Sequence, residues 1–187
     1  PYTGYDRFGR TVDMPWSKTT DGTLLDRIQY GYNRASNRTW RKNLVATSGQ
    51  DEAYGYDDLY QVKSAARGNL NLNQTAIGGI PNSGEQFDYD PAGNWLQYTS
   101  ETDGAVTLDQ TRVNNLDNQI TQFDGAATGV THDRAGNATL LPPDASGNWE
   151  KSYILTWDAW NRLVKVELGT TEVAIYAYDG LSSRTSK

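Results

Sequence analysis

The sequence predicts an all-β protein of tandem β-hairpin repeats, whose strands join in one continuous, coiling antiparallel sheet. Three observations support this fold class. A short motif, usually an aromatic residue followed by Asp or Asn, recurs eight times at intervals of 19 to 33 residues. Apolar and polar side chains alternate around the copies, and no 3.6-residue apolar pattern is present. Aromatic residues make up 11% of the chain although hydrophobic residues make up only 36%, and broad amphipathic rings suit pleated strands.

Each motif predicts a four-residue turn. A type I turn favours Asp or Asn first, Pro second and Gly fourth, and Asp90-Pro91-Ala92-Gly93 matches all three preferences. The first side chain can accept a hydrogen bond from the backbone N–H two residues on. Tyr60 takes the fourth position of the third turn, where we expect a small strain or a different turn. The eight predicted turns lie near residues 6–9, 33–36, 57–60, 90–93, 114–117, 133–136, 158–161 and 179–182.

Strand-like alternation flanks these turns. Ile28, Tyr30 and Tyr32 alternate with polar residues or glycine before the second turn, and segments 153–157 and 164–168 alternate similarly around the seventh. A single hairpin of this length cannot bury its aromatic face alone. We therefore expect neighbouring hairpins to lie side by side in the sheet.

Polar links rich in turn-forming residues join the hairpins. The interval between the third and fourth motifs is the longest because it holds the insertion 69–84, where we expect the most mobile loop. The array is already in mid-repeat at Tyr5, and its last copy begins shortly before Lys187. We expect residues 1–187 to be a single repeat array within a longer chain.

Composition argues against several classes of function. The net charge is -6, with 23 acidic and 17 basic residues and no basic run, which is unfavourable for binding a phosphate backbone. The chain has no cysteine, which excludes disulfides and thiolate chemistry. No stretch is long and apolar enough to predict a membrane span.

The repeats closely resemble the YD repeat of the RHS/teneurin superfamily, whose unit is roughly Tyr-x-Tyr-Asp-x-x-Gly-Arg/Asn-Leu. The resemblance covers essentially the whole chain and is strongest in segments 54–57, 87–94 and 176–179. It implies that the sheet forms part of a hollow shell, tube or barrel. It also implies a secreted or cell-surface protein, of bacterial type, in which such a shell often encloses a C-terminal toxin; animal members work in cell adhesion.

Two features depart from this family. The closing core segment with its Asp-Pro-rich cleavage motif is not visible before Lys187, and Asp90-Pro91 lies inside a repeat, so we assign no autoproteolysis. Eight repeats are also fewer than a complete shell is expected to need.

Catalytic chemistry has little support in the sequence. His132, the one histidine, occupies the aromatic position of the sixth motif, where a structural role is favoured. A Ser-His-Asp triad is not supported by any Gly-x-Ser-x-Gly motif. Asp88 and Asp90 share a strand face and could pair in glycoside cleavage, but the register already assigns Asp90 to a turn.

Other candidate sites have equally plain explanations. Asp103-Gly104 and segment 144–148 offer oxygen ligands for calcium, yet neither matches a twelve-residue calcium loop. Asn37, Asn73 and Asn137 begin Asn-x-Ser/Thr sequons; the first and last share one position of the repeat, and Asn73 in the insertion is the most accessible.

The tryptophans are numerous for this length and are expected on the packed face of the sheet. If exposed, they could bind sugars by stacking, and Trp149, in a polar link, is the strongest candidate for exposure. The six are Trp16, Trp40, Trp95, Trp149, Trp157 and Trp160.

Together these patterns predict a non-catalytic structural module of a secreted or surface protein, forming a shell, tube or filament scaffold that encloses cargo or builds an extracellular assembly. A carbohydrate- or cell-surface-binding adhesin is the alternative, and a glycoside hydrolase-like enzyme is the least supported. We nominate no catalytic, cofactor-binding or metal-binding residue and no cofactor. Expected partners are further YD repeats of the same protein or a second copy, joined through exposed sheet edges, and an enclosed toxin domain or a glycan. Nucleic acid is not expected.

Overall fold

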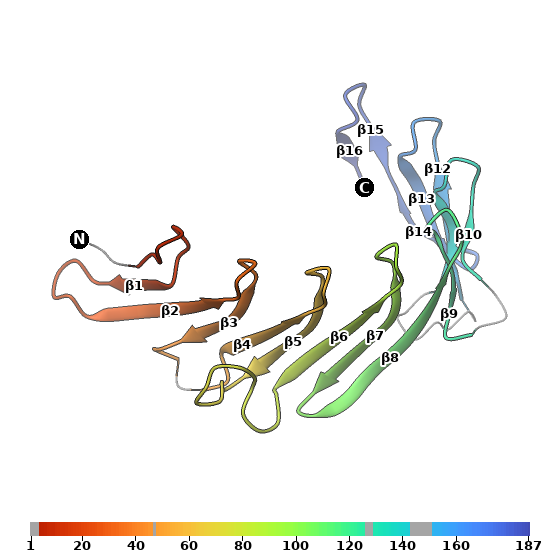
Figure 1. Ribbon diagram of the computed structural model, residues 1–187. Coiled ribbons are helices and arrows are strands. Elements are labelled where there is room, and N and C mark those ends of the chain that lie inside the picture. Colours follow the sequence, from red (N-terminus) through yellow and green to blue (C-terminus); the bar gives the residue numbers. More distant parts are fainter. Residues whose placement is uncertain (1–3, 47, 126–128, 143–150) are drawn as a thin grey trace. The chain divides into compact units, whose positions relative to one another are not determined.

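The structure is a computed structural model that describes residues 4–46, 48–125, 129–142 and 151–187 (Figure 1). These residues form strands and turns and include no helix, so none of them belongs to a helix able to cross a membrane. The strands are β1 (Asp13–Ser17), β2 (Leu24–Tyr32), β3 (Arg38–Asn43), β4 (Asp51–Tyr56), β5 (Val62–Gly68), β6 (Ser83–Tyr89), β7 (Trp95–Thr102), β8 (Ala105–Asn114), β9 (Ile120–Phe123), β10 (Thr131–His132), β11 (Ala138–Leu141), β12 (Tyr153–Trp157), β13 (Leu163–Leu168), β14 (Thr171–Ile175), β15 (Ala177–Tyr178) and β16 (Arg184–Ser186).

Each strand pairs with its neighbour in sequence, in three antiparallel sheets that hold β1–β9, β10–β14 and β15–β16. Among the described residues, one backbone bond lies near each boundary between the sheets. The N–H of Val130 donates to the carbonyl oxygen of Thr121 at 2.8 Å, and the N–H of Tyr176 donates to that of Val164 at 2.9 Å. The predicted all-β fold of antiparallel hairpins is confirmed. Closure of the sheet into a shell, tube or barrel stays a prediction.

The chain divides into two compact units. Unit 1 contains residues 1–88 and 98–107, and unit 2 contains residues 89–97 and 108–187. In unit 1 the hairpins β2–β3 and β4–β5 lie side by side with their connecting turns at the same edge (Figure 1). This arrangement places equivalent side chains of successive repeats next to one another.

A register shift precedes the hairpin turns. In unit 1 it lies between Gly31 and Tyr32 and between Gly55 and Tyr56. Such a shift is the bulge that accompanies a type I turn whose last residue is left-handed. The same shift occurs in unit 2 at 113/114, 131/132, 156/157 and 177/178.

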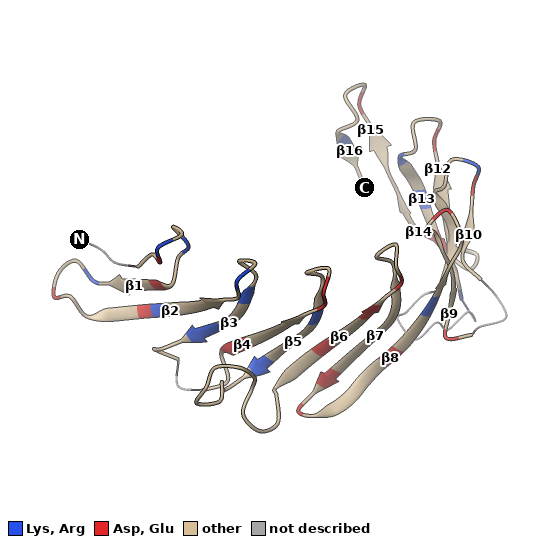
Figure 2. Cartoon of the chain, in the orientation of Figure 1, with Lys and Arg blue, Asp and Glu red and all other residues tan. Residues whose placement is uncertain are grey.

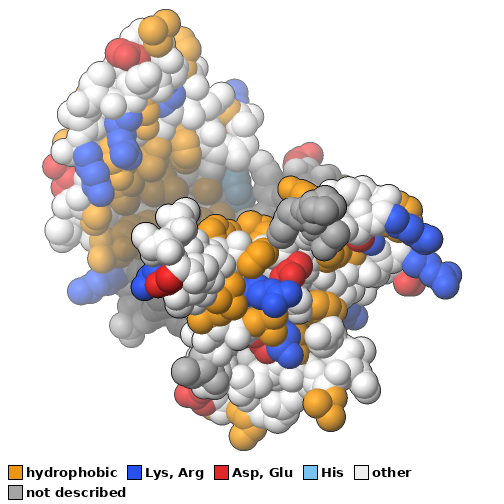
Figure 3. Space-filling model, turned by 90° about the vertical axis from the view of Figure 1, so that its left-hand side faces the viewer, with side chains coloured by type: hydrophobic (Ala, Val, Ile, Leu, Met, Phe, Trp, Pro, Cys, Tyr) orange, Lys and Arg blue, Asp and Glu red, His pale blue; other side chains and the backbone are white. Residues whose placement is uncertain are grey.

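The sheet buries little apolar surface. Among the described residues only Ile28, Ala53 and Val130 are buried hydrophobic side chains, and many large ones are exposed. Figure 3 shows apolar side chains open to view at the surface. Close packing occurs at Gly31, where an added Cβ would lie only 2.0 Å from Nε1 of Trp40. Cohesion between the repeats must therefore come largely from hydrogen bonds and ring contacts.

The insertion 69–84 contains a small hairpin of its own. Leu70 and Ile77 form an isolated antiparallel bridge, and Asn71 Oδ1 accepts the N–H of Thr75 at 3.0 Å. Buried Asp51 holds the start of the insertion, because its carboxylate accepts the N–H groups of Leu70 at 3.1 Å and Asn43 at 2.9 Å. Whether this is the most mobile loop stays a prediction.

Candidate functional site

The turn edge is the part of the molecule with the most regular chemistry. Each of the eight turns closes with two backbone bonds: the first N–H donates to the fifth carbonyl, and the fourth N–H donates to the first carbonyl. The fourth residue always has a positive φ, between 59° and 90°. These residues are Gly9, Ser36, Tyr60, Gly93, Asn118, Gly136, Asn161 and Ser182. Tyr60 thus adopts the same turn as the others, at a left-handed φ of 64° that is unfavourable for a bulky side chain.

The first side chain of each turn accepts two backbone bonds. In the fourth turn, Asp90 Oδ1 accepts the N–H of Ala92 and of Asn94, both at 2.9 Å. The bond from the third residue is the one expected of an Asx turn, and the bond from the fifth residue was not predicted. The equivalent acceptors are Asp6, Asn33, Asp57, Asn115, Asp133, Asp158 and Asp179.

The fifth turn lies at 115–118 and not at the predicted 114–117. Asn115 is the acceptor, and Asn118 has the positive φ of 59°. The prediction was one residue early because Asn114 and Asn115 are both suited to start a turn. Asn114 instead takes the position before the turn, where most other repeats have an aromatic residue.

That position forms a first link between repeats. Tyr32 donates its hydroxyl to the carbonyl oxygen of Thr11, at 2.9 Å. Thr11 is the sixth residue of the preceding motif counted from its Asp. Asn114 makes the same bond to Trp95 at 3.3 Å, so its amide replaces the phenol. The same bond runs from Tyr56 to Arg38, from Trp157 to Ala138 and from Tyr178 to Leu163, at 2.7 to 2.8 Å.

The fifth residue of a turn forms a second link. Arg10 binds Asp6 at 2.7 Å and also donates to the backbone oxygen of Asn33 and to Ser36 Oγ in the next turn, at 3.2 and 3.1 Å. Its guanidinium carbon lies 4.6 Å from the centre of the Tyr32 ring. Arg162 binds Asp158, the backbone oxygen of Asp179 and the Tyr178 ring in the same way.

Asparagine makes this second link through its amide group. Asn137 Nδ2 donates to Asp133 Oδ2 at 3.0 Å and to Asn161 Oδ1 at 2.9 Å. Asn94 repeats the pattern with Asp90 and Asn118. The second turn differs, since the buried Nδ2 of Asn37 has no hydrogen-bond partner in the described part of the chain.

These contacts change the acidity of the turn carboxylates. Hydrogen bonds from the side chains of Asn94 and Asn137 hold the pKa of Asp90 and of Asp133 below the ordinary value, and backbone N–H groups act in the same direction. Burial alone would raise the pKa of Asp6, but backbone and side-chain bonds from Arg10 outweigh it and lower that pKa.

The residues considered for catalysis have structural partners. Asp90 uses its carboxylate within its own turn, and Asp88 is exposed and lies 3.7 Å from Lys63. His132 belongs to β10, opposite Ala138 in β11. No pairing of Asp88 with Asp90 for acid–base chemistry is supported by these contacts.

The candidate glycosylation and calcium sites differ in their exposure and in their contacts. Asn73 is exposed in the insertion, whereas the amide nitrogen of Asn137 is engaged in two hydrogen bonds and that of Asn37 is buried. Asp103 and Gly104 form the tight turn between β7 and β8, with φ values of 50° and 76°. The calcium candidate 144–148 lies outside the described residues, and the described part of the chain holds no group of three His, Asp or Glu side chains suited to a metal ion.

Tryptophan exposure differs from the expectation of one packed face. Trp160 is 74% exposed at the tip of the seventh turn, and Trp16 is 44% exposed on β1. Trp40, Trp95 and Trp157 are partly buried. Trp149 lies outside the described residues.

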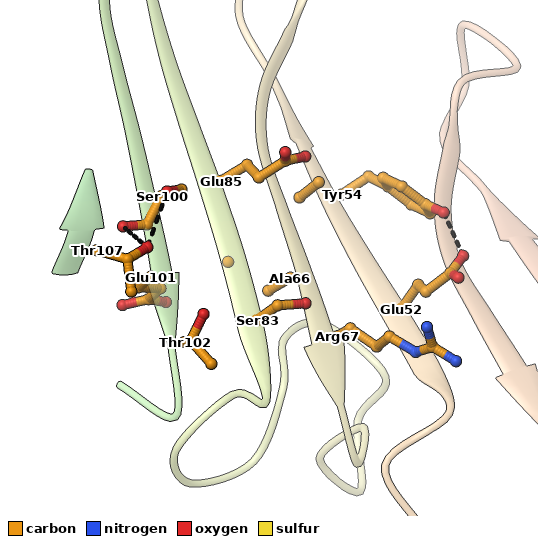
Figure 4. A pocket seen from close by; sticks show the side chains of 12 residues that line it. Glu52, Tyr54, Ala66, Arg67, Ser83, Glu85, Ser100, Glu101, Thr102 and Thr107 are labelled. Carbon is orange, nitrogen blue, oxygen red and sulfur yellow. Dashed lines mark hydrogen bonds between the residues drawn. The ribbon is translucent and has the colours of Figure 1, made fainter. Parts of the chain in front are cut away.

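A groove of about 440 Å³ on the sheet of unit 1 was not predicted (Figure 4). The Tyr54 hydroxyl donates to Glu52, and Glu85 accepts the Tyr98 hydroxyl at 2.8 Å. Burial and the Glu52 carboxylate raise the pKa of Tyr54 to about 12, so this phenol remains protonated and cannot act as a base near neutral pH. The Tyr54 phenol therefore gives no support to a hydrolase. Glu52 and Arg67 lie directly opposite each other on β4 and β5, and this pairing of opposite charges forms part of the polar wall of the groove.

Several solved structures share the fold of this chain. The sequence matches no family model and no curated protein. A chain of the Tc holotoxin pore of Photorhabdus luminescens, with a mutant TccC3, matches with a TM-score of 0.69 and 18% identity. Chains of TcdB2–TccC3, and of TcdB2–TccC3 without its hypervariable C-terminal region, match with TM-scores of 0.68 and 0.61 at 17% and 15% identity. Each match covers 96% of this chain but 10% of the other, and at this identity shows the fold alone.

Proposed function

We propose that the chain is a non-catalytic scaffold module, a section of a YD-repeat sheet that forms part of a secreted or surface-exposed shell, tube or filament. The supporting observation is the repeated bond from the residue before one turn to the sixth residue of the preceding motif. This contact is local to neighbouring repeats, as in other repeat proteins. It stabilises an extended array without a closed hydrophobic core.

The scaffold role agrees with how the chemistry is distributed. The turn carboxylates are engaged in holding the turns, and in the groove of unit 1 the Tyr54 hydroxyl donates to Glu52 while the Ser100 and Thr107 hydroxyls bond to each other. Enclosure of a cargo such as a toxin domain belongs to this proposal, and its motivation is the fold shared with segments of Tc toxin chains.

The sheet ends provide the means of assembly. Among the described strands, β1 pairs only with β2 and β16 only with β15; on the other side of β1, the first residue Asp13 donates its N–H to the carbonyl oxygen of Gly4. Unpaired strand edges favour addition of further strands. We therefore propose that both ends accept further repeats, either from the same protein or from a second copy, and that head-to-tail addition gives open filaments.

Sedimentation velocity over a concentration series tests this proposal. We expect the 187-residue chain to form larger species as its concentration rises. Trp16→Lys places a charge on the exposed edge strand β1 and should reduce assembly, whereas Leu72→Lys makes the same change in the exposed insertion and should not. A chain that stays strictly monomeric at high concentration would overturn assembly through the sheet ends.

A further inference from the structure

The first two turns enclose a hollow with an unusual composition. It has a volume of about 420 Å³, lies within unit 1, and is called the two-turn hollow below. Three of its seven lining residues are arginines and none is acidic, although the whole chain has a net charge of -6. The lining residues are Arg7, Phe8, Arg10, Tyr32, Asn33, Arg34 and Ser36.

Two of these arginines keep an uncompensated charge. Arg10 is neutralised by Asp6 at 2.7 Å. Arg7 and Arg34 are exposed and form no ion pair with a described residue. Figure 2 shows the blue of Lys and Arg at both of these turns, whereas the next turn of unit 1 is red. The two-turn hollow therefore has a net positive charge.

The fixed groups of the hollow also present hydrogen-bond donors. Arg10 lies over the rings of Phe8 and Tyr32, at 5.1 and 4.6 Å, and donates to Ser36 Oγ. The Ser36 hydroxyl therefore retains its own proton to donate. Asn33 Oδ1 already accepts two backbone N–H groups, which leaves its amide nitrogen as a donor.

The repeat register explains why this occurs at one place. Arg7 and Arg34 hold the second position of consecutive turns, so two intervening strand spacings of about 4.8 Å each separate them. In the other turns the second residues are Asp58, Pro91, Leu116, Arg134, Ala159 and Gly180. Only the first two turns put guanidinium groups at this position on neighbouring repeats.

We propose that the two-turn hollow binds an anionic oligosaccharide, a glycan with sulfate or carboxylate groups on successive sugars. The forked donors of Arg7 and Arg34 match the planar or tetrahedral oxygens of such groups. The guanidiniums of Arg7 and Arg10 lie over the Phe8 ring, at 4.6 and 5.1 Å, so this ring holds the two cations at the hollow and leaves the recognition of the glycan to the charged groups. Two guanidiniums without an ion-pair partner among the described residues suit a short charged glycan better than a long nucleic acid, whose binding depends on many phosphate contacts. This site goes beyond the scaffold role and does not depend on it.

Isothermal titration of the 187-residue chain with a sulfated hexasaccharide prepared from heparin tests the proposal. We expect binding at low salt that weakens as salt increases. Arg7→Gln and Arg34→Gln should each lower the affinity about tenfold, and the double variant about a hundredfold. Arg134→Gln removes the arginine at the same position of the sixth turn, whose neighbouring turns have no arginine there, and should leave the affinity unchanged.

Several results would overturn the proposal. These are absence of binding by the parent chain, equal binding by the Arg7→Gln/Arg34→Gln variant, and binding of a neutral maltohexaose with the same affinity. Tighter binding of duplex DNA or of vesicles with anionic lipid, with the same arginine dependence, would overturn the glycan assignment. Near-ultraviolet circular dichroism checks that each variant keeps its fold; Arg7→Lys and Arg34→Lys, which retain charge but lose the fork, should bind with intermediate affinity.

Discussion

The pair formed by the second and third turns differs from the pair formed by the sixth and seventh in one side-chain hydrogen-bond link between the two turns. Both pairs have the bond from the residue before the later turn, from Tyr56 to Arg38 in one and from Trp157 to Ala138 in the other. In the sixth turn, the Asn137 amide also joins its own turn to the next one. In the second, the equivalent Asn37 Nδ2 is buried without a partner among the described residues.

The residues around these two asparagines explain the difference. Asp133 offers a second carboxylate oxygen to Asn137, whereas Asn33 has an amide nitrogen in that place. Asn161 offers an acceptor from the next turn, whereas Tyr60 has no acceptor close to its backbone. The bond from Tyr56 or Trp157 goes to a backbone carbonyl, which is present whatever residue stands at that position. The link through Asn137 also requires suitable side chains at two other positions, Asp133 and Asn161.

Removing the first side chain of a turn should have the largest effect. Asn33→Ala leaves the N–H groups of Ala35 and Asn37 without their acceptor, and should lower the free energy of unfolding by about 2 kcal/mol. Asp133→Ala should cost more, because the link through Asn137 is lost as well. Urea unfolding followed by tryptophan fluorescence measures both. Equal losses would mean that the side-chain link contributes nothing.

The two asparagines should respond differently to truncation. Asn137→Ala removes two hydrogen bonds and should lower the free energy of unfolding by about 1 kcal/mol. Asn37→Ala removes a buried group without a partner and should change it little or raise it. The same urea titration compares them, and an equal loss at both positions would contradict the assignment of Asn37 as unpaired.

The missing link can be restored by one substitution. Tyr60→Asn suits the left-handed φ of 64° and gives Asn37 the acceptor that Asn161 gives to Asn137, so we expect a gain of about 1 kcal/mol. Tyr60→Gly is the matched control, because it accepts the same φ without adding an acceptor. The gain from Asn over Gly should vanish when Asn37 is alanine; if it persists, the new amide acts in another way.

Acid should produce the smallest difference. The pKa of folded Asp133 lies below its ordinary value of 3.8, so its stabilising contribution is complete above that value and is lost as the pH falls through the folded pKa. Asn33 does not titrate in this range. Hydrogen exchange corrected for its intrinsic pH dependence should show protection of the Ala135 and Asn137 amides falling in acid. Protection of the Ala35 amide should hold, and Asp133→Asn should abolish the contrast.

The turns and the strands beside them were predictable because their signals are local. Asp or Asn at the first position and Gly at the fourth indicate a type I turn with a left-handed last residue, as in Asp90 to Gly93. The error at 114–117 arose where two asparagines competed for one position. Nothing in the motif itself distinguishes Asn114 from Asn115 until the contact with Trp95 is known.

The links between repeats were not predictable from the motif alone. In the sequence, Arg10 and Asn137 are polar residues that follow a turn, with no sign of a second partner. Their bonds to the next turn join residues 23 to 26 positions apart, which a local pattern cannot predict. The two-turn hollow could not be predicted for the same reason, since strand pairing alone brings Arg7 and Arg34, 27 residues apart in the sequence, to one site. Trp160 is 74% exposed within the seventh turn, so an aromatic residue near the motif does not always pack on the sheet.

The side-chain links that recur from repeat to repeat lie near the turn edge, and this affects how such a chain can evolve. The opposite edge varies freely, from the tight Asp103-Gly104 turn to the insertion 69–84. Duplication or deletion of a gene segment that preserves the residues around a turn leaves the contacts of its neighbours in place, whatever the length of the link. Recombination can thus lengthen or shorten the array, and new loops can arise at one margin without disturbing the other.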